Sequence, residues 1–219
     1  MKKYFPVLRK CSLFQQIQEE QLSALLQCLG AIVKSYSKKE SILKEGLPAK
    51  HIGIVLSGSV QMIQIDYYGN RSIVSHAEPS ELFGESFACA EVSSIPISVV
   101  ANESCEIMLI ECQRMIHSCS NACEFHQQLI YNLLKNVARK NIQFHQKIEI
   151  TSKRSTREKL MTYLILQAKK ANSNRFDIPF DRQELADYLE VDRSGLSAEI
   201  SKLRKEGILR SEKKRFELL

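Results

Sequence analysis

A long stretch without proline or glycine constrains the fold of this chain more than any other feature. No Pro or Gly occurs from residue 121 to Pro179, and within it apolar residues recur four and three positions apart. The recurring positions are Ile130, Leu134, Val137, Asn141, Phe144 and Ile148. Such a heptad seam, with one polar residue to fix register, predicts a helix over 122–148 that pairs with a second copy as a parallel dimer.

A single amphipathic helix packed on its own domain is the alternative interpretation of this stretch. The dimer is favoured because Leu129, Leu133 and Ala138 supply a second apolar edge, which we expect to face the barrel. Asn121 and Glu124 have the spacing of a capping box that would open the helix.

The segment before this helix has the sequence pattern of β-strands. Residues 12–30 have helical periodicity and end at Gly30, but from about 31 to 112 the chain consists of short apolar runs broken by turns. Alternation in 60–66, followed by Gly69-Asn70 and a further β-rich run, indicates a hairpin. Several such runs predict an antiparallel barrel or sandwich.

The segment after the helix has a different order of elements. Capping boxes at Ser155–Glu158 and Asp181–Glu184 predict two further helices, with a short strand between them near 175–180. A turn and a third helix over 193–206 follow, and the chain ends in a hairpin. This order of elements is that of a winged helix-turn-helix domain: helix, strand, helix, turn, helix and hairpin.

The distribution of charge divides the chain into three parts. Residues 1–118 have a net charge of −1, residues 119–150 of +2 and residues 151–219 of +5, within a total of +6. We therefore expect a β-rich domain at 1–118, a long helix at 119–150 and a basic domain at 151–219 to which a polyanion such as nucleic acid would bind. The absence of a long apolar run and of a secretory signal predicts a cytoplasmic protein with no membrane contact and mostly reduced cysteines.

Several stretches in this order resemble the CRP/FNR transcription regulators. They are the text around 46–60, "LFGES" at 82–86, "CEIMLIE" at 105–111, the heptad helix and "RQELADYLEVDRSGLSAEISKLRKEGIL" at 182–209. The resemblance covers nearly the whole chain. It implies an α+β fold: a jelly-roll barrel of the cyclic-nucleotide-binding type, a dimerisation helix and a C-terminal winged helix-turn-helix. It also implies a homodimer on double-stranded DNA, controlled by an effector at the barrel, with RNA polymerase as a partner if the protein is an activator.

The expected recognition helix explains the polar residues of 190–207. Leu196, Ile200 and Leu203 would face inward, which leaves Arg193, Ser194, Ser197 and Ala198 toward a DNA groove, where Arg and Ser can bind base edges. The predicted DNA-binding residues are Arg182, Arg193, Ser194, Ser197, Lys202, Lys213 and Lys214. The best-known members have Arg-Glu-x-x-x-Arg here. Since Ser194 and Ala198 replace the second and third of these residues, a palindromic site is expected but not the familiar half-site.

The effector position departs from the cyclic AMP receptors of this family. Gly84 and Glu85 match their Gly-Glu pair, but the Arg-Ser pair that holds the phosphate aligns with Ile95-Pro96. No Lys or Arg occurs from Ser72 to Gln113, which argues against cyclic AMP unless Arg71 or Arg139 supplies the charge. The predicted effector-binding residues are Gly84, Glu85, Ser86, Ser98, Phe144 and His145, which suit a small neutral or aromatic ligand.

A cysteine–histidine cluster offers a redox or metal signal instead of a ligand. Cys119, Cys123 and His126 could hold Zn²⁺ or a softer metal, or Cys123 could be a reactive thiolate that pairs with Cys119. The alternative is that both cysteines are small buried apolar residues and that His126 lies on the surface. An iron–sulfur cluster of the FNR type is not supported, because only Cys11 and Cys28 precede the barrel. Cys89, Cys105 and Cys112 are expected in the barrel core.

Two other classes of protein fit the sequence less well. An enzyme would need a catalytic motif, and none is present beyond Cys123 and His126 three positions apart on one helix, which cannot easily flank a substrate. A ligand-binding regulatory protein with weakened DNA binding is kept open by Ser194 and Ala198.

Overall fold

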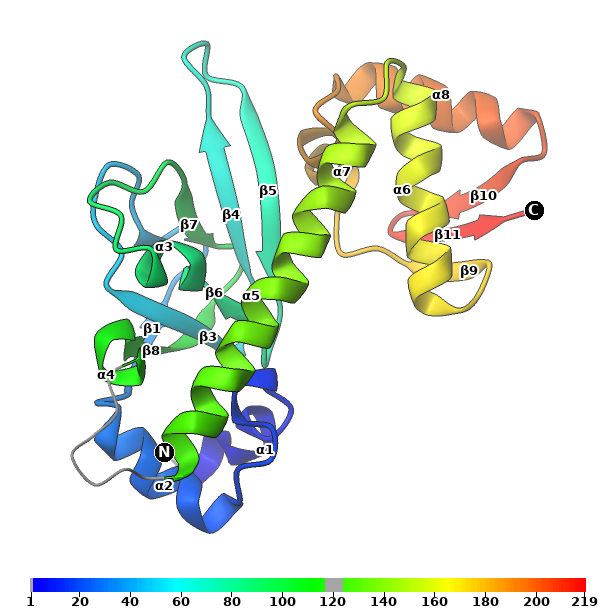
Figure 1. Cartoon of the computed structure of the whole chain (residues 1–219). Coiled ribbons are helices and arrows are strands. Elements are labelled where there is room, and N and C mark those ends of the chain that lie inside the picture. Colours follow the sequence, from blue (N-terminus) through cyan, green and yellow to red (C-terminus); the bar gives the residue numbers. More distant parts are fainter. Residues whose placement is uncertain (1, 117–123) are drawn as a thin grey trace. The chain divides into compact units, whose positions relative to one another are not determined.

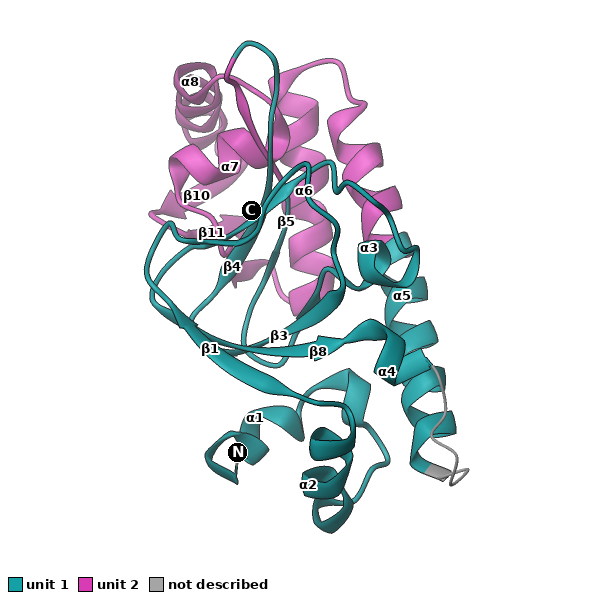
Figure 2. Ribbon diagram, turned by 90° about the vertical axis from the view of Figure 1, so that its left-hand side faces the viewer, with its two compact units in different colours: residues 1–68, 74–141 teal, residues 69–73, 142–219 magenta. Residues whose placement is uncertain are grey.

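The computed structural model describes residues 2–116 and 124–219, which form two compact units (Figures 1 and 2). One unit comprises Met1–Tyr68 and Val74–Asn141, and the other comprises Gly69–Ile73 and Ile142–Leu219. The division falls within the long helix, so the helix that the sequence set apart at 119–150 contributes residues to both units.

The β-structure of the first unit consists of two four-stranded sheets. The first sheet has the order β1, β8, β3, β6, formed by Ile32–Tyr36, Cys105–Glu111, His51–Ser57 and Leu82–Phe83. The second has the order β2, β7, β4, β5, formed by Ser41–Leu43, Ser98–Ala101, Val60–Ile65 and Arg71–Ala77. The strand pairs whose registers are described, such as Ile32 opposite Leu109, are antiparallel, and the predicted antiparallel fold is confirmed.

Strand β3 is apolar almost throughout because it is buried on both faces. Ile52, Ile54 and Leu56 pack into a core with the N-terminal helices, whereas Val55 packs into the core between the sheets. Gly53 is required at its position, because a Cβ there would lie 2.1 Å from the ring of Phe83. A strand with two covered faces lacks polar alternation, as the sequence of β3 does.

Short helices complete the first unit. They are the 3-10 turns η1 (Lys2–Tyr4) and η2 (Ser12–Phe14) and the α-helices α1 (Phe5–Leu8), α2 (Glu19–Cys28), α3 (Glu85–Cys89) and α4 (Cys112–Ile116). The prediction of one helix over 12–30 is wrong before Glu19. Gln16 has a positive φ of 66°, which interrupts the helix, and a reciprocal cap between Gln18 and Gln21 starts α2.

Helix α5 (Glu124–Thr151) packs against the first unit through a mixed apolar and polar face. Leu129 and Leu133 are buried there as predicted. Between them, the Asn132 amide donates to the carbonyls of Leu13 at 2.9 Å and Gln15 at 2.8 Å. The expectation that Ala138 belongs to this face is wrong, because Ala138 is exposed and the buried face continues through Asn136 instead.

The second unit has the predicted order of a winged helix-turn-helix domain. Its elements are α6 (Thr156–Ala171), β9 (Arg175–Asp177), α7 (Arg182–Leu189), α8 (Arg193–Lys205), β10 (Leu209–Glu212) and β11 (Arg215–Leu218). The capping boxes at Ser155 and Asp181 are both formed, which explains why α6 and α7 begin where they do. The capping box predicted at Asn121 lies outside the described residues.

Candidate DNA interface and effector position

Helix α8 has one buried face and one exposed face. Leu196, Ile200 and Leu203 are at most 3% exposed, so they attach the helix to the second unit. The opposite face carries Arg193, Ser194, Ala198 and Lys202, all exposed, together with the half-buried Ser197. This arrangement is the one that the sequence predicts for a recognition helix, whose N-terminal half reaches base edges.

The turn between α7 and α8 depends on small and capping residues. Ala186 is fully buried, so α7 and α8, which contact each other, can cross closely. Glu190 ends α7 with a positive φ of 54°, and the Asp192 side chain accepts a hydrogen bond from the Gly195 N–H at 2.8 Å to begin α8. These interactions hold the first turn of α8 in a defined orientation.

The Ser194 hydroxyl already has a partner within this turn. It donates its proton to Asp192 Oδ2, and this bond, together with the Gly195 N–H, holds the pKa of the Asp192 carboxyl below its usual value. Ser194 therefore retains only acceptor capacity toward a DNA base.

Three arginines of the helix-turn-helix lie near one another. Burial lowers the pKa of Arg182, and the positive charges of Arg193 and Arg204 lower it further. Arg182 Nη1 is enclosed and has no hydrogen-bond partner within the described residues. A guanidinium group with an unused donor beside two like charges can attract an anion such as a phosphate.

The two lysines of the wing differ from each other. Lys213 is exposed at the tip of the β10–β11 hairpin, with a positive φ of 51°. Lys214 Nζ instead donates to the Pro179 carbonyl at 2.6 Å, and the neighbouring Arg215 pairs with Asp177 at 3.2 Å. Of the two wing lysines, Lys214 is therefore the one whose ammonium group is held by a described carbonyl.

The predicted effector position lies at the start of α3. Gly84 precedes the helix with a positive φ of 76°, a conformation that favours glycine, and Ser86 is half-buried in its first turn. Glu85 is only 1% exposed. A buried carboxylate requires a compensating charge, whereas the sequence offered Arg71 or Arg139 only as partners for a ligand phosphate.

Lys140 of α5 supplies this charge, a residue that the sequence analysis missed. Lys140 Nζ lies 2.7 Å from Glu85 Oε1 and donates to the Leu82 carbonyl at 2.6 Å. Neither Glu85 oxygen has a well-directed hydrogen bond within the described residues, so the contact is a charge pair. Arg139, considered from sequence, is exposed. Helical spacing could have found Lys140, since it lies seven positions after Leu133 on the same face.

The other predicted effector residues lie on β7 and on the later part of α5. Ser98 on β7 is half-buried, and its Oγ accepts a hydrogen bond from the Glu45 N–H at 3.2 Å. Phe144 and His145 lie further along α5 in the second unit, and both are exposed there.

The cysteine–histidine cluster is described only at His126. This side chain is 1% exposed, so the alternative that it lies on the surface is wrong, and a ring nitrogen lies 3.4 Å from the Arg114 carbonyl. Cys119 and Cys123 lie outside the described residues. Within the described part of the chain, no three Cys, His, Asp or Glu side chains are grouped as metal ligands.

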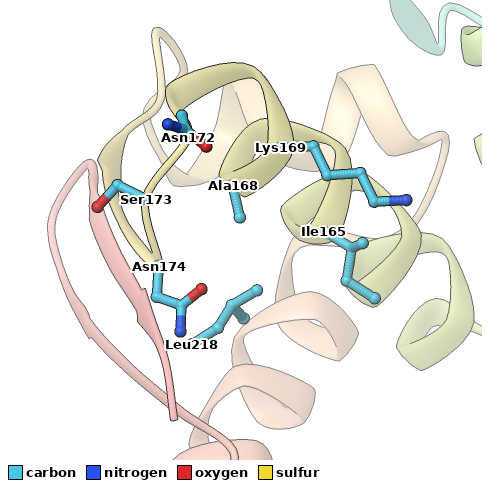
Figure 3. Close-up of a pocket in the computed structure, with 7 residues that line it drawn as sticks. All are labelled: Ile165, Ala168, Lys169, Asn172, Ser173, Asn174 and Leu218. Atoms are coloured by element: carbon cyan, nitrogen blue, oxygen red, sulfur yellow. The ribbon is translucent and has the colours of Figure 1, made fainter.

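A surface pocket lies at the end of α6 (Figure 3). Its lining comprises Ile165, Ala168, Lys169, Asn172, Ser173, Asn174 and Leu218. The lining has one cation, Lys169, and no carboxylate or imidazole beside it that could act as its acid–base partner. No helix in the described ranges 2–116 and 124–219 is long and apolar enough to cross a membrane.

Comparison with known protein families identifies both parts of the chain. Residues 33–121 match the cyclic nucleotide-binding domain, and residues 158–219 match the Crp-like helix-turn-helix domain. The combination of a cyclic-nucleotide-binding-type β-domain with this DNA-binding module defines a class of transcription regulators. The chain belongs to the CRP/FNR family of DNA-binding transcription regulators.

Individual relatives are distant but cover most of the chain. The transcriptional activator FnrA of Stutzerimonas stutzeri is 24% identical over 187 residues, 83% of this chain and 74% of the relative. FixK2 of Bradyrhizobium japonicum shares the fold with a TM-score of 0.67 and 22% identity, over 86% of this chain and 92% of FixK2. The c-di-GMP-responsive global regulator CLP of Xanthomonas campestris has a TM-score of 0.73 at 17% identity, over 92% and 99% of the two chains.

Proposed function

We propose that the chain acts as a homodimeric transcription regulator that binds a palindromic promoter site and responds to an effector other than cyclic AMP. The observation that carries this proposal is the exposed face of α8, where Arg193 and the short residues Ser194 and Ala198 stand free of the packed core. In this proposal α8 enters the major groove, and two-fold symmetry places a second α8 about one helical turn away.

In this proposal, few side chains recognise the base sequence of the DNA. Arg193 can bind a guanine edge through two hydrogen bonds, and Ser197 can donate or accept. Arg182, Lys202 and Lys213 are assigned to phosphates, which position the domain without reading sequence. The wing's Lys214 contributes charge only, because its ammonium is engaged by Pro179.

The dimer is supported by the exposed seam of α5. Leu134 is 65% exposed and Ile148 is 61% exposed in the single chain, although both are large aliphatic side chains. Ile130 and Phe144 are also exposed, at the spacing of a heptad. Covering this stripe with the same stripe of a second chain would remove its apolar surface from water, with Asn141 to fix the register.

The effector is proposed not to be cyclic AMP because Glu85 and Lys140 already neutralise each other. A cyclic phosphate at this position would compete with Glu85 for Lys140 and would meet the repulsion of the same buried carboxylate. A small neutral or aromatic ligand avoids this conflict. The relative FnrA of Stutzerimonas stutzeri is a transcriptional activator, which supports activation by this chain with RNA polymerase as partner, in the cytoplasm.

Fluorescence anisotropy on the chain's own upstream promoter DNA tests DNA binding. At two salt concentrations, we expect sequence-preferring binding that weakens steeply with salt, since each phosphate contact releases a counterion. Addition of cyclic AMP should leave the affinity unchanged. Binding that is weak and indifferent to sequence at both salt concentrations, with either reduced or oxidised protein, would instead favour a ligand-binding protein with weakened DNA binding.

Sedimentation equilibrium tests the dimer. Leu134→Glu places a charge in the seam and should give a monomer, because two carboxylates would be buried opposite each other. Ile165→Glu, at an exposed aliphatic residue of α6, is the matched control and should remain a dimer. A Leu134→Glu chain that sediments as a dimer would contradict the assigned seam.

A further inference from the structure

Two cysteines that the sequence placed separately in the core lie side by side. Cys89 is the last residue of α3 and Cys112 the first of α4, and their Sγ atoms are 3.5 Å apart. Both belong to the first unit, where α3 and α4 contact each other. We infer that Cys89 and Cys112 form a redox-active dithiol, which a hydroperoxide converts into an intramolecular disulfide.

The separation of the sulfurs suits this reaction. The S–S bond of a disulfide is about 2.05 Å long, so the two atoms need to approach by roughly 1.5 Å. Cys112 is held directly after β8, where its N–H donates to the Lys50 carbonyl at 3.0 Å, whereas Cys89 ends the five-residue helix α3, so the approach falls mainly to Cys89. The bond would close a loop that contains β7 and β8.

The two thiols are unequal, which assigns a role to each. Cys89 is half-buried and therefore reachable from solvent, whereas Cys112 is 1% exposed. Either thiol can donate in the contact between them. With the enclosed Cys112 as the donor, this interaction lowers the pKa of Cys89, while the same interaction and burial raise the pKa of Cys112. Cys89 is therefore the attacking thiolate and Cys112 the resolving thiol.

The proposed reaction balances in two steps. The Cys89 thiolate attacks the hydroperoxide ROOH, forms an S–O bond and breaks the O–O bond, and the leaving alkoxide takes a proton as ROH. Cys112 then loses its proton, attacks the sulfur of the Cys89 sulfenic acid and releases water. The two sulfurs together lose two electrons, and the peroxide gains them.

The remaining described cysteines lack this arrangement. Cys11 is fully buried, and burial raises its pKa to about 12. Cys105 is buried between the sheets, and burial raises its pKa also. Cys28 on α2 is exposed but has no described sulfur neighbour, which makes it the matched control for simple accessibility.

The location of the dithiol connects it to the effector position. Cys89 lies one helical turn after Glu85 on α3, so the disulfide would join the helix that carries this buried carboxylate to the end of β8. The disulfide assignment itself does not depend on DNA binding and can stand if the proposed function fails.

Mass mapping of the reduced full-length chain tests the inference. After treatment with one equivalent of hydrogen peroxide, alkylation and digestion without reductant, we expect a cross-linked peptide joining Cys89 to Cys112, with Cys28 still alkylated. A cross-link from Cys89 to Cys119 or Cys123 would overturn the inference, as would oxidation of Cys28 before Cys89.

Single substitutions separate the two roles. In Cys112→Ser, Cys89 should stop at the sulfenic acid and be captured by dimedone, whereas in Cys89→Ser the Cys112 thiol should remain reduced. Cys28→Ser should behave as the unsubstituted chain. Thermal melting by circular dichroism identifies any variant that fails to fold, and Cys112→Ala then replaces Cys112→Ser. Dimedone capture at Cys112 in Cys89→Ser would overturn the assignment of roles.

Discussion

The cationic side chains of α5 and those of the helix-turn-helix differ in what surrounds them. Lys140 and Lys147 of α5 are each enclosed by their own unit, with side chains 21% and 10% exposed. Arg193 and Arg204 of α8 are exposed and form no ion pair with an acid among the described residues. Enclosed cations therefore contribute to the stability of the fold, whereas exposed ones remain available to bind a polyanion.

The two enclosed lysines also differ from each other, although they lie seven residues apart on one helix. Lys140 faces the buried carboxylate of Glu85 at 2.7 Å. Lys147 has Glu190 only at 3.8 Å, donates to the Tyr188 carbonyl and lies 3.9 Å from the Tyr188 ring centroid. Burial lowers the pKa of Lys147 to about 8, with Lys159 adding to this and Glu190 opposing it.

The largest expected effect is on the free energy of unfolding, and it tests the role of the enclosed cations. Lys140→Met leaves Glu85 buried without its cation, and we expect the free energy of unfolding to fall by about 3 to 5 kcal/mol in urea titrations. Lys135→Met, an exposed lysine of the same helix, should change it little. The double variant Glu85→Gln, Lys140→Met should regain most of the loss, because no charge is then buried. Equal stability of Lys140→Met and Lys135→Met would contradict a stabilising pair.

A pH titration distinguishes Lys147 from Lys140. The folded-state pKa of Lys147, about 8, lies below the unfolded value near 10.5, so between these pH values the unfolded chain binds more protons. The free energy of unfolding should therefore rise with pH over this window, by at most roughly 3 kcal/mol, relative to Lys147→Met. Chemical denaturation of both proteins at pH 7, 8, 9 and 10 measures the difference. A difference that stays constant with pH would show that burial does not depress this pKa.

For the exposed cations, affinity rather than stability should change. Arg193→Ala should weaken binding to the upstream promoter DNA by about 1 to 3 kcal/mol and relax sequence preference at one base pair of each half-site. Its urea midpoint should match that of the unsubstituted chain. Lys169→Ala, which also removes one positive charge from the second unit, is the control for net charge. If both variants lost the same affinity, Arg193 would be contributing charge alone.

The smallest effect on DNA binding is expected at Arg182, which is half-buried and so lies between the enclosed and the exposed cations in its exposure. Arg182→Gln should reduce the slope of log affinity against log salt concentration by about one and leave sequence preference unchanged. Anisotropy at four salt concentrations on promoter and scrambled DNA measures this. An unchanged slope would place Arg182 with the enclosed cations, and a lower unfolding free energy would support that.

Much of the second unit could be predicted from sequence because its signals are local. The Asp181–Glu184 box and the Asp192 cap act within three residues, and the buried stripe of Leu196, Ile200 and Leu203 follows from helical periodicity alone. The start of α2 was misplaced because the apolar spacing over 12–30 continues through Gln16 and gives no sign of the positive φ that interrupts the helix there.

The sequence by itself determined the order of the elements and the exposed face of α8, since periodicity and capping depend on residues a few positions apart. The family came from the resemblance of several stretches to the CRP/FNR regulators. The tertiary structure alone decided which distant groups meet. Lys140 reaches Glu85 across 55 positions, and Cys89 reaches Cys112 across 23, because sheet and helix packing bring α3 against α4 and α5. Such contacts have no sequence period, since they depend on the path of the intervening strands rather than on the geometry of any one element.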